Sequence, residues 1–74
     1  MGRPFEMEWL LAELFQMEVD DMIVIDDYDN NAINSAIKRW RRGLYANHGY
    51  PALPAEVKFV VLNNKPKVYI VRFR

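Results

Sequence analysis

Apolar residues recur with a helical period in two stretches of this chain and crowd into strand-like runs in three others. The first helical stretch is PFEMEWLLAELFQ, residues 4–16, where apolar positions fall at i, i+3, i+4 and i+7. Pro4 suits a first helical turn, and the glutamates that follow suit the positive end of a helix dipole. The pattern predicts a short helix whose buried face holds four residues: Met7, Leu10, Leu11 and Leu14.

Three aromatic residues of this stretch, Phe5, Trp9 and Phe15, lie beside that face rather than on it. A surface helix in a small domain needs only one apolar face, and the apolar residues of this helix extend beyond one face. Either the helix is buried on two sides, or part of it meets a second molecule. The three aromatic residues are therefore candidate contacts with a protein partner or with a second copy in a homodimer.

The run Met-Ile-Val-Ile at 22–25, bracketed by aspartates, is typical of a short β-strand. Asp27 or Asp29 then stands as the N-cap of a second helix over roughly 30–47. Gly49 is a plausible end for this helix, and Gly43 is a possible earlier one. The predicted core face follows a period of about 3.6 residues: Ile33, Ala36 or Ile37, Trp40 and Leu44.

The segment NHGYPALPAE, residues 47–56, is a predicted loop because of its glycine and prolines. Residues 57–62 and 67–73 are two predicted strands, and residues 63–66 join them as a hairpin. In the second of these strands Val68, Ile70 and Arg72 alternate with Tyr69, Val71 and Phe73. Both sets are largely apolar, so the period alone does not decide which set faces the core.

This order of elements predicts an α+β fold. A short N-terminal helix precedes a β-α-β-β unit, whose three-stranded antiparallel sheet packs on one long helix. We expect a single domain over residues 1–74, with 1–16 as a helical arm and 17–74 as the core. A chain of 74 residues is near the lower end of what folds unaided, and oligomerisation often adds stability to so small a core.

The net charge is zero, but the charges are divided between two parts of the chain. Residues 1–29 carry nine acidic side chains and one base, Arg3, whereas residues 30–74 carry nine bases and one acid, Glu56. Such asymmetry indicates a nucleic acid or another charged partner. The alternative is that the two halves fold against each other and neutralise their charges, because so small a domain cannot hold them far apart.

Several classes of protein do not fit the composition. The chain has no cysteine for a disulfide, a thiolate metal site or a thiol nucleophile. No long apolar run suggests a signal peptide or a membrane span, so a cytoplasmic protein is expected. His48 is the only histidine, Ser35 is the only serine, and no glycine-rich phosphate loop is present. We therefore expect no catalytic activity.

One acidic stretch has partial metal-ligand spacing. Asp27, Asp29 and Asn31 match the first three ligand positions of an EF-hand calcium loop. The sixth position needs glycine and has Ala32, and the twelfth needs glutamate and has Lys38. Helix capping accounts for these acids without a metal, and we expect neither a metal site nor a cofactor.

The basic face of the second helix is the main candidate binding site. Nucleic-acid contact draws on arginine and lysine for phosphates, and on asparagine or arginine for base edges. The bases of this helix have no acidic partner four residues away along it, although a solvated face balanced by the acidic half is the alternative. The candidate contacts with nucleic acid or an acidic partner lie on this helix and at the hairpin: Asn31, Asn34, Lys38, Arg39, Arg41, Arg42, Tyr45, Lys65 and Lys67.

The succession of MEVDDMIVI, IKRWRRGLYANHG and KFVVLNNKPKVYIVRF resembles a group of small phage proteins. Their pattern is a Met-Glu-Val-Gly-Asp entry to a strand, a helix with alanine and arginine, and a C-terminal hairpin of alternating aromatic and basic residues. The resemblance covers about residues 17–73. This chain differs in having Asp20 where the pattern has glycine, and in a longer loop at 47–56.

The resemblance implies a non-enzymatic regulator or inhibitor in the cytoplasm of a bacterial host. Such a protein would bind a host protein or nucleoprotein complex that handles nucleic acid, such as RNA polymerase or a CRISPR surveillance complex. The alternative is a regulator that binds DNA or RNA directly, with the helix at 30–45 as its reading element and the C-terminal hairpin beside it.

Overall fold

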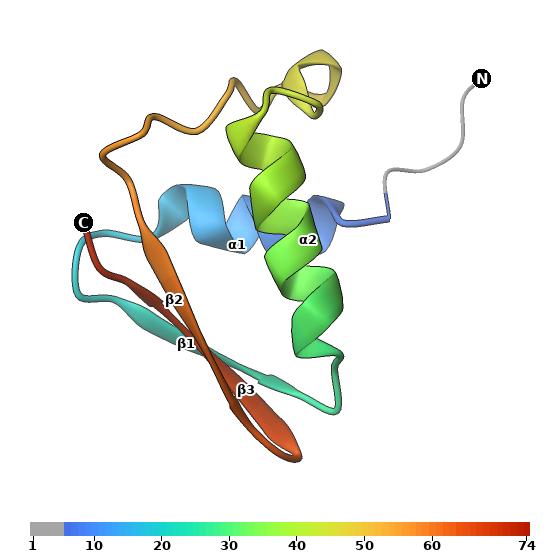
Figure 1. Cartoon of the computed structure of the whole chain (residues 1–74), viewed down its shortest axis with the longest axis vertical. Coiled ribbons are helices and arrows are strands. Elements are labelled where there is room, and N and C mark those ends of the chain that lie inside the picture. The colour runs from blue at the N-terminus through green and yellow to red at the C-terminus, as the bar shows by residue number, and fades with distance from the viewer. Residues whose placement is uncertain (1–5) are drawn as a thin grey trace.

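The computed structural model describes residues 6–74, which form two α-helices and a three-stranded antiparallel sheet (Figure 1). This confirms the predicted α+β class. In chain order the elements are α1 (Glu8–Gln16), β1 (Met22–Asp26), α2 (Asn30–Arg41), the short 3-10 helix η1 (Ala46–His48), β2 (Phe59–Asn64) and β3 (Lys67–Arg72). Neither α-helix in the described part of the chain is long and apolar enough to cross a membrane.

The sheet has the strand order β1-β3-β2, so the strand that follows the other two in sequence lies between them. β2 and β3 form a hairpin that turns at Lys65 and Pro66, whose peptide bond is cis. β1 pairs with the other side of β3, with Ile23 opposite Ile70 and Ile25 opposite Val68. β2 ends at Asn64 rather than at the predicted residue 62. The hairpin turn is therefore shorter than the predicted turn over residues 63–66.

Both helices cover the same face of the sheet, and the core lies between them and the strands (Figure 1). From the sheet, Val68 and Ile70 are almost fully buried, with Ile23, Ile25 and Val61 packed beside them. The helices contribute seven buried residues: Leu10, Leu11 and Leu14 from α1, and Ile33, Ala36, Ile37 and Trp40 from α2. Two helices of 9 and 12 residues thus cover the face of the sheet that was predicted to pack on one long helix.

The start of α2 follows one of the two predicted caps. The carboxylate of Asp29 accepts a hydrogen bond from the backbone N–H of Asn31 at 2.9 Å, which satisfies one of the helix's free N–H groups. Asp27 instead lies just after β1 with a φ of 51°, in the left-handed region. Its backbone N–H donates to the carbonyl of Pro66 at 2.8 Å, so it ties the end of β1 to the hairpin turn.

α2 ends at Arg41, six residues before the predicted end at 47. Gly43 has a φ of 81°, which glycine adopts at little cost, and its N–H donates to the carbonyl of Trp40 at 2.9 Å. The earlier of the two glycine stops is therefore the one the fold uses. Because the helix ends there, Leu44 is 55% exposed, and its predicted place on the core face is wrong.

Candidate functional site

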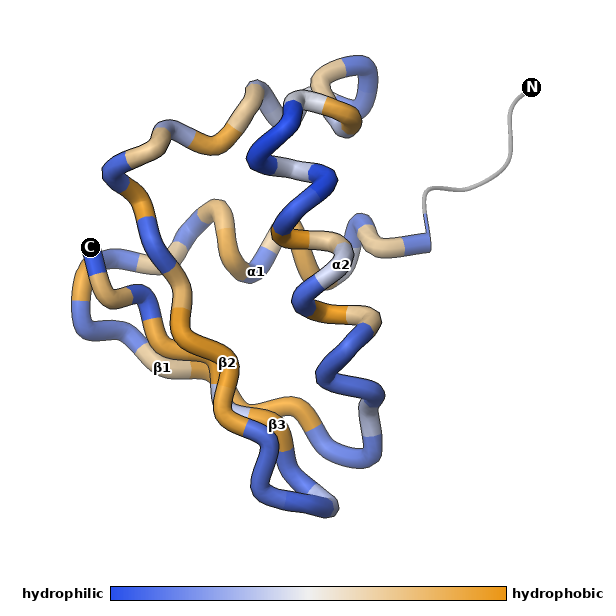
Figure 2. Tube along the Cα trace, viewed as in Figure 1, coloured by the Kyte–Doolittle hydropathy of each residue, from blue (hydrophilic) through white to orange (hydrophobic). Residues whose placement is uncertain are grey.

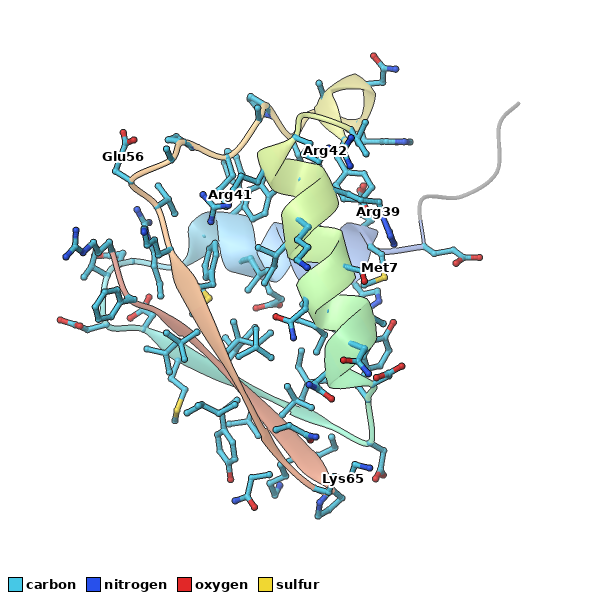
Figure 3. All side chains as sticks on the ribbon, viewed as in Figure 1. Met7, Arg39, Arg41, Arg42, Glu56 and Lys65 are labelled. Carbon is cyan, nitrogen blue, oxygen red and sulfur yellow. The ribbon has the colours of Figure 1, made fainter. Side chains whose placement is uncertain are left out.

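The last turn of α2 and the residue after it carry three exposed bases, Lys38, Arg39 and Arg42, which we call the basic end. Arg39 and Arg42 lie on one side of the helix, while Arg41 lies on the other side, toward the loop that leads to β2 (Figure 3). Positive side chains at this position are also favourable because they complement the negative end of the helix dipole.

Arg41 is half-buried, although the sequence predicted a place for it on the exposed face of the helix. Its Nη1 donates to the carbonyl of Pro54 at 3.1 Å, and its Nη2 donates to the carbonyl of Val57 at 2.9 Å. The neighbouring Trp40 donates from its indole Nε1 to the carbonyl of Pro51 at 2.9 Å. These bonds hold the irregular segment 51–57 against the end of α2, and both terminal nitrogens of the Arg41 guanidinium take part in them.

The three bases of the basic end differ in their partners. The Nε of Arg39 donates to the hydroxyl of Tyr45 at 3.2 Å, which orients the guanidinium at the surface. The side chains of Lys38 and Arg42 form no hydrogen bond or ion pair with any of residues 6–74. Tyr45 is half-buried and acts here as a hydrogen-bond partner of Arg39, rather than as the exposed stacking platform that the sequence suggested.

Lys65, at the hairpin turn, lies at the opposite end of the molecule from Arg39 and Arg42 (Figure 3), and Lys67 begins β3 two residues later. The ammonium of Lys67 pairs with the carboxylate of Asp26 at 2.9 Å, and this hydrogen bond raises the pKa of Lys67 above its ordinary value. Lys65 lines a shallow depression together with Asp27 and Asp29. The positive charge of the hairpin is therefore largely offset by the aspartates around it.

The nine residues predicted to form one basic surface are thus divided. Asn31 lies in the first turn of α2, about 16 Å along the helix axis from Arg42, at 1.5 Å per residue. Asn34 is exposed one turn before Lys38. The structure brings together Lys38, Arg39 and Arg42, and it leaves the hairpin lysines and Asn31 at the other end.

The aromatic residues of α1 are half-exposed but already have neighbours within the domain. Trp9 is 42% exposed and makes an edge-to-face contact with Tyr28, with ring centroids 5.2 Å apart. Phe15 stacks on Trp40 at 6.3 Å between centroids and touches Tyr50 edge-on. Each therefore presents only part of its ring to a partner. Phe5, the third predicted contact, lies outside the described residues.

An apolar cavity of about 290 Å³ opens beside Phe15 and Trp40. Pro51, Pro54, Phe59 of β2 and Arg72 are among the other residues that line it. Arg72 is engaged there, because its Nη1 donates to the carbonyl of Met17 at 2.7 Å and its Nε to the carbonyl of Arg74 at 2.9 Å. The cavity is thus mainly apolar, and two nitrogens of the Arg72 guanidinium beside it are held by backbone carbonyls.

The sheet has a second apolar surface that the sequence did not identify as a candidate site. On the face opposite the helices, six apolar side chains stand in two rows across the three strands, and we call them the outer sheet face: Met22, Val71 and Val60 in one row, and Val24, Tyr69 and Leu62 in the other. Figure 2 shows the strands as mostly hydrophobic, with hydrophilic residues at the hairpin tip. The available signal was that consecutive residues of these strands, not alternate ones, are apolar.

Comparison with models of known protein families, with curated proteins and with solved structures found no match to this chain. Within residues 6–74, no group of three histidine or carboxylate side chains is placed to hold a metal ion. Two surfaces of the described chain are candidate binding sites: the basic end of α2 and the outer sheet face.

Proposed function

We propose that this protein acts by binding rather than by catalysis, and that the basic end of α2 contacts an acidic site on a protein partner. The observation that carries the proposal is the presence of three exposed bases at one end of a helix, two of which have no partner in residues 6–74. Opposite charges across an interface speed association and select the correct partner more than they add affinity.

The small number of bases grouped at the basic end favours a protein over a nucleic acid as the partner. Proteins that bind duplex DNA through its backbone commonly contact about six to ten phosphates. Here Arg41 is engaged with the 51–57 segment, Lys67 is paired with Asp26, and the net charge of the chain is zero. The three bases of the basic end are enough to meet a small acidic patch on a protein.

The resemblance to small phage proteins supports a more specific form of this proposal. In that form the partner is part of a host complex that handles nucleic acid, such as RNA polymerase or a CRISPR surveillance complex. The protein would then be a regulator or inhibitor in the bacterial cytoplasm, and it would act by occupying an acidic surface on that complex.

Direct binding of DNA or RNA is the second candidate function. The observation that favours it is the exposed side chain of Asn34, one helical turn before Lys38 on α2. Asparagine can pair with the edge of adenine while nearby bases contact phosphates. In this case α2 would be the reading element.

Two measurements with one set of variants test these functions. The double variant Lys38→Glu with Arg42→Glu reverses the two unpartnered charges of the basic end, and Lys58→Glu with Lys65→Glu is a control with the same charge change elsewhere. Circular dichroism establishes that both variants remain folded. We expect a partner captured from a bacterial lysate to be retained by the wild type and the control, and to be lost by the basic-end variant. A partner retained equally by all three would overturn the proposal.

Fluorescence anisotropy with labelled DNA and RNA, at low and at physiological salt, separates the two functions. Three phosphate contacts give a slope of about −3 in log affinity against log salt, and correspondingly weak binding at physiological salt. Tight binding with a slope steeper than about −5, lost in the basic-end variant, would establish direct nucleic-acid binding instead.

A further inference from the structure

The outer sheet face is the largest set of exposed apolar side chains on a regular element in the described structure. Four of the nine large apolar side chains exposed in residues 6–74 belong to it, and Phe73 extends it to five. Leu62 is 52% exposed and Met22 is 55% exposed, so about half of each residue is open to water. Monomeric proteins rarely leave contiguous apolar patches larger than a few hundred Å² in water.

A polar row closes this face at the hairpin end. Asp26, Lys67 and Asn64 lie side by side across the three strands, directly beyond the row of Val24, Tyr69 and Leu62. The carboxylate of Asp26 and the ammonium of Lys67 pair at 2.9 Å, so the row carries no net charge. An apolar centre with a polar border is the usual arrangement of a protein interface.

We propose that the outer sheet face is the interface of a homodimer, in which the sheets of two copies pack face to face. Paired sheets of this kind lie about 10 Å apart and interdigitate their inner side chains. A two-fold axis that lies between the two sheets and perpendicular to the strands brings the row of Met22, Val71 and Val60 against the other row of the second copy. Each copy then covers the apolar surface of the other.

Three properties favour a second copy of this chain as the occupant. The chain has zero net charge and the polar row is neutral, so two copies meet without electrostatic repulsion. A 74-residue domain buries a small share of its surface when it folds, and association supplies the missing burial. A face made of two similar apolar rows is also able to match itself, as a two-fold interface requires.

The size of the face sets the expected strength of the dimer. Three strands spaced about 4.8 Å apart, with about six residues each at a rise of about 3.4 Å, give a flat area on the order of 300 Å² per copy. Two copies together give about 600 Å² of flat area. Protruding side chains and the polar border add accessible surface, so the buried total approaches about 1,000 Å², the lower limit of specific interfaces. We therefore expect a dimer that dissociates on dilution.

The dimer is independent of the function proposed above. Packing the sheets together leaves both α2 helices on the outside, and it leaves the bases of the basic end in water. Failure of the dimer would not affect binding through Lys38 and Arg42, and reversal of those charges would not affect the dimer.

The test is the molar mass of the full chain by sedimentation equilibrium over a wide range of protein concentration. Leu62→Lys places a charge in the proposed interface, on its β2 side. Leu44→Lys is the matched control, because Leu44 is 55% exposed and lies on the turn after α2. We expect the wild type and Leu44→Lys to approach twice the chain mass as concentration rises. Leu62→Lys should dimerise at least about tenfold more weakly, because the interface would bury an unpaired charge.

Three outcomes would overturn the proposal: a wild type that stays monomeric at every concentration, a dimer that Leu62→Lys leaves intact, and equal weakening by both variants. The second outcome would locate self-association at a strand edge or at α1. Val24→Lys, also on the outer sheet face, replaces Leu62→Lys if circular dichroism shows that the latter is unfolded.

Discussion

The two faces of the sheet are made from similar residues but have different surroundings. Along β3, Val68 and Ile70 are 1% and 0% exposed beneath the helices, whereas their neighbours Tyr69 and Val71 stand on the open side and are only partly covered. The strand sequence is apolar at all four positions. The difference teaches that burial in this sheet depends on what covers each face, because hydrophobicity alone does not distinguish them.

The faces also differ in how they accommodate charge. Arg72 shares the inner face with Ile70, and its guanidinium donates to two backbone carbonyls at 2.7 and 2.9 Å. Lys67 stands on the outer face, and its ammonium pairs with an exposed carboxylate. A charge beneath the helices thus has backbone partners fixed by the fold, while a charge on the open face has a side-chain partner that water can replace.

The largest expected effect comes from shortening an inner-face side chain. Ile70→Ala removes buried atoms at the centre of the core, and we expect it to lower the free energy of unfolding by about 2–5 kcal/mol. Val24→Ala, on the outer sheet face, should lower it by less than about 1 kcal/mol. Urea unfolding at low protein concentration, where the chain is monomeric, provides both values. Equal losses would mean that the two faces are equally buried in the monomer.

A medium effect is expected from Arg72. Arg72→Ala removes the donors to the carbonyls of Met17 and Arg74, and we expect a loss of about 1–3 kcal/mol in the free energy of unfolding. Arg74→Ala is the matched control, since that exposed side chain only rests over the ring of Phe73 at 5.5 Å and should cost about 0.5 kcal/mol or less. Thermal unfolding followed by circular dichroism measures both, and a smaller loss for Arg72→Ala than for Arg74→Ala would contradict the comparison.

The smallest effect is expected from the exposed pair of Lys67 and Asp26. The hydrogen bond from Lys67 to Asp26 raises the lysine pKa above 10.5, so the pair stabilises the fold below that pH and loses this effect as the pH rises through the folded value. Because both groups are exposed, Lys67→Met should reduce stability only slightly at neutral pH. High salt should remove the difference in stability between Lys67→Met and the wild type. A loss of stability as large as that of Arg72→Ala would show that water does not reach the pair freely.

Much of the fold followed from local patterns in the sequence. The buried positions Leu10, Leu11 and Leu14 were predicted from helical spacing, and Trp40 was predicted for the core face of α2. The end of α2 was harder to predict, because Gly43 and Gly49 both offer a left-handed stop and both adopt positive φ. In the structure α2 ends before Gly43, where Trp40 and Arg41 donate hydrogen bonds to carbonyls of the 51–57 segment, and such long-range contacts cannot be read from local spacing.

The candidate site was predicted less well than the fold. Helical spacing placed Arg41 with Lys38 on an exposed side, but it cannot reveal that the carbonyls of Pro54 and Val57 come within reach of the guanidinium. The sequence pattern groups Lys65 and Lys67 with the bases of α2 in one predicted surface. Spacing along the chain does not give the distance in space between the hairpin and the end of α2. The outer sheet face was missed because the assignment of a face requires knowing where both helices pack.

The position of β3 between β1 and β2 has a consequence for protein synthesis. The partners Asp26 and Lys67 are 41 residues apart, so β1 emerges from the ribosome well before the strand that it pairs with. Until then its Ile-Val-Ile segment has no ladder to join, and pairing across so long a separation closes slowly. A nascent chain halted before β3 would therefore carry two unmatched strands, and it would be a natural substrate for chaperones that hold extended apolar segments.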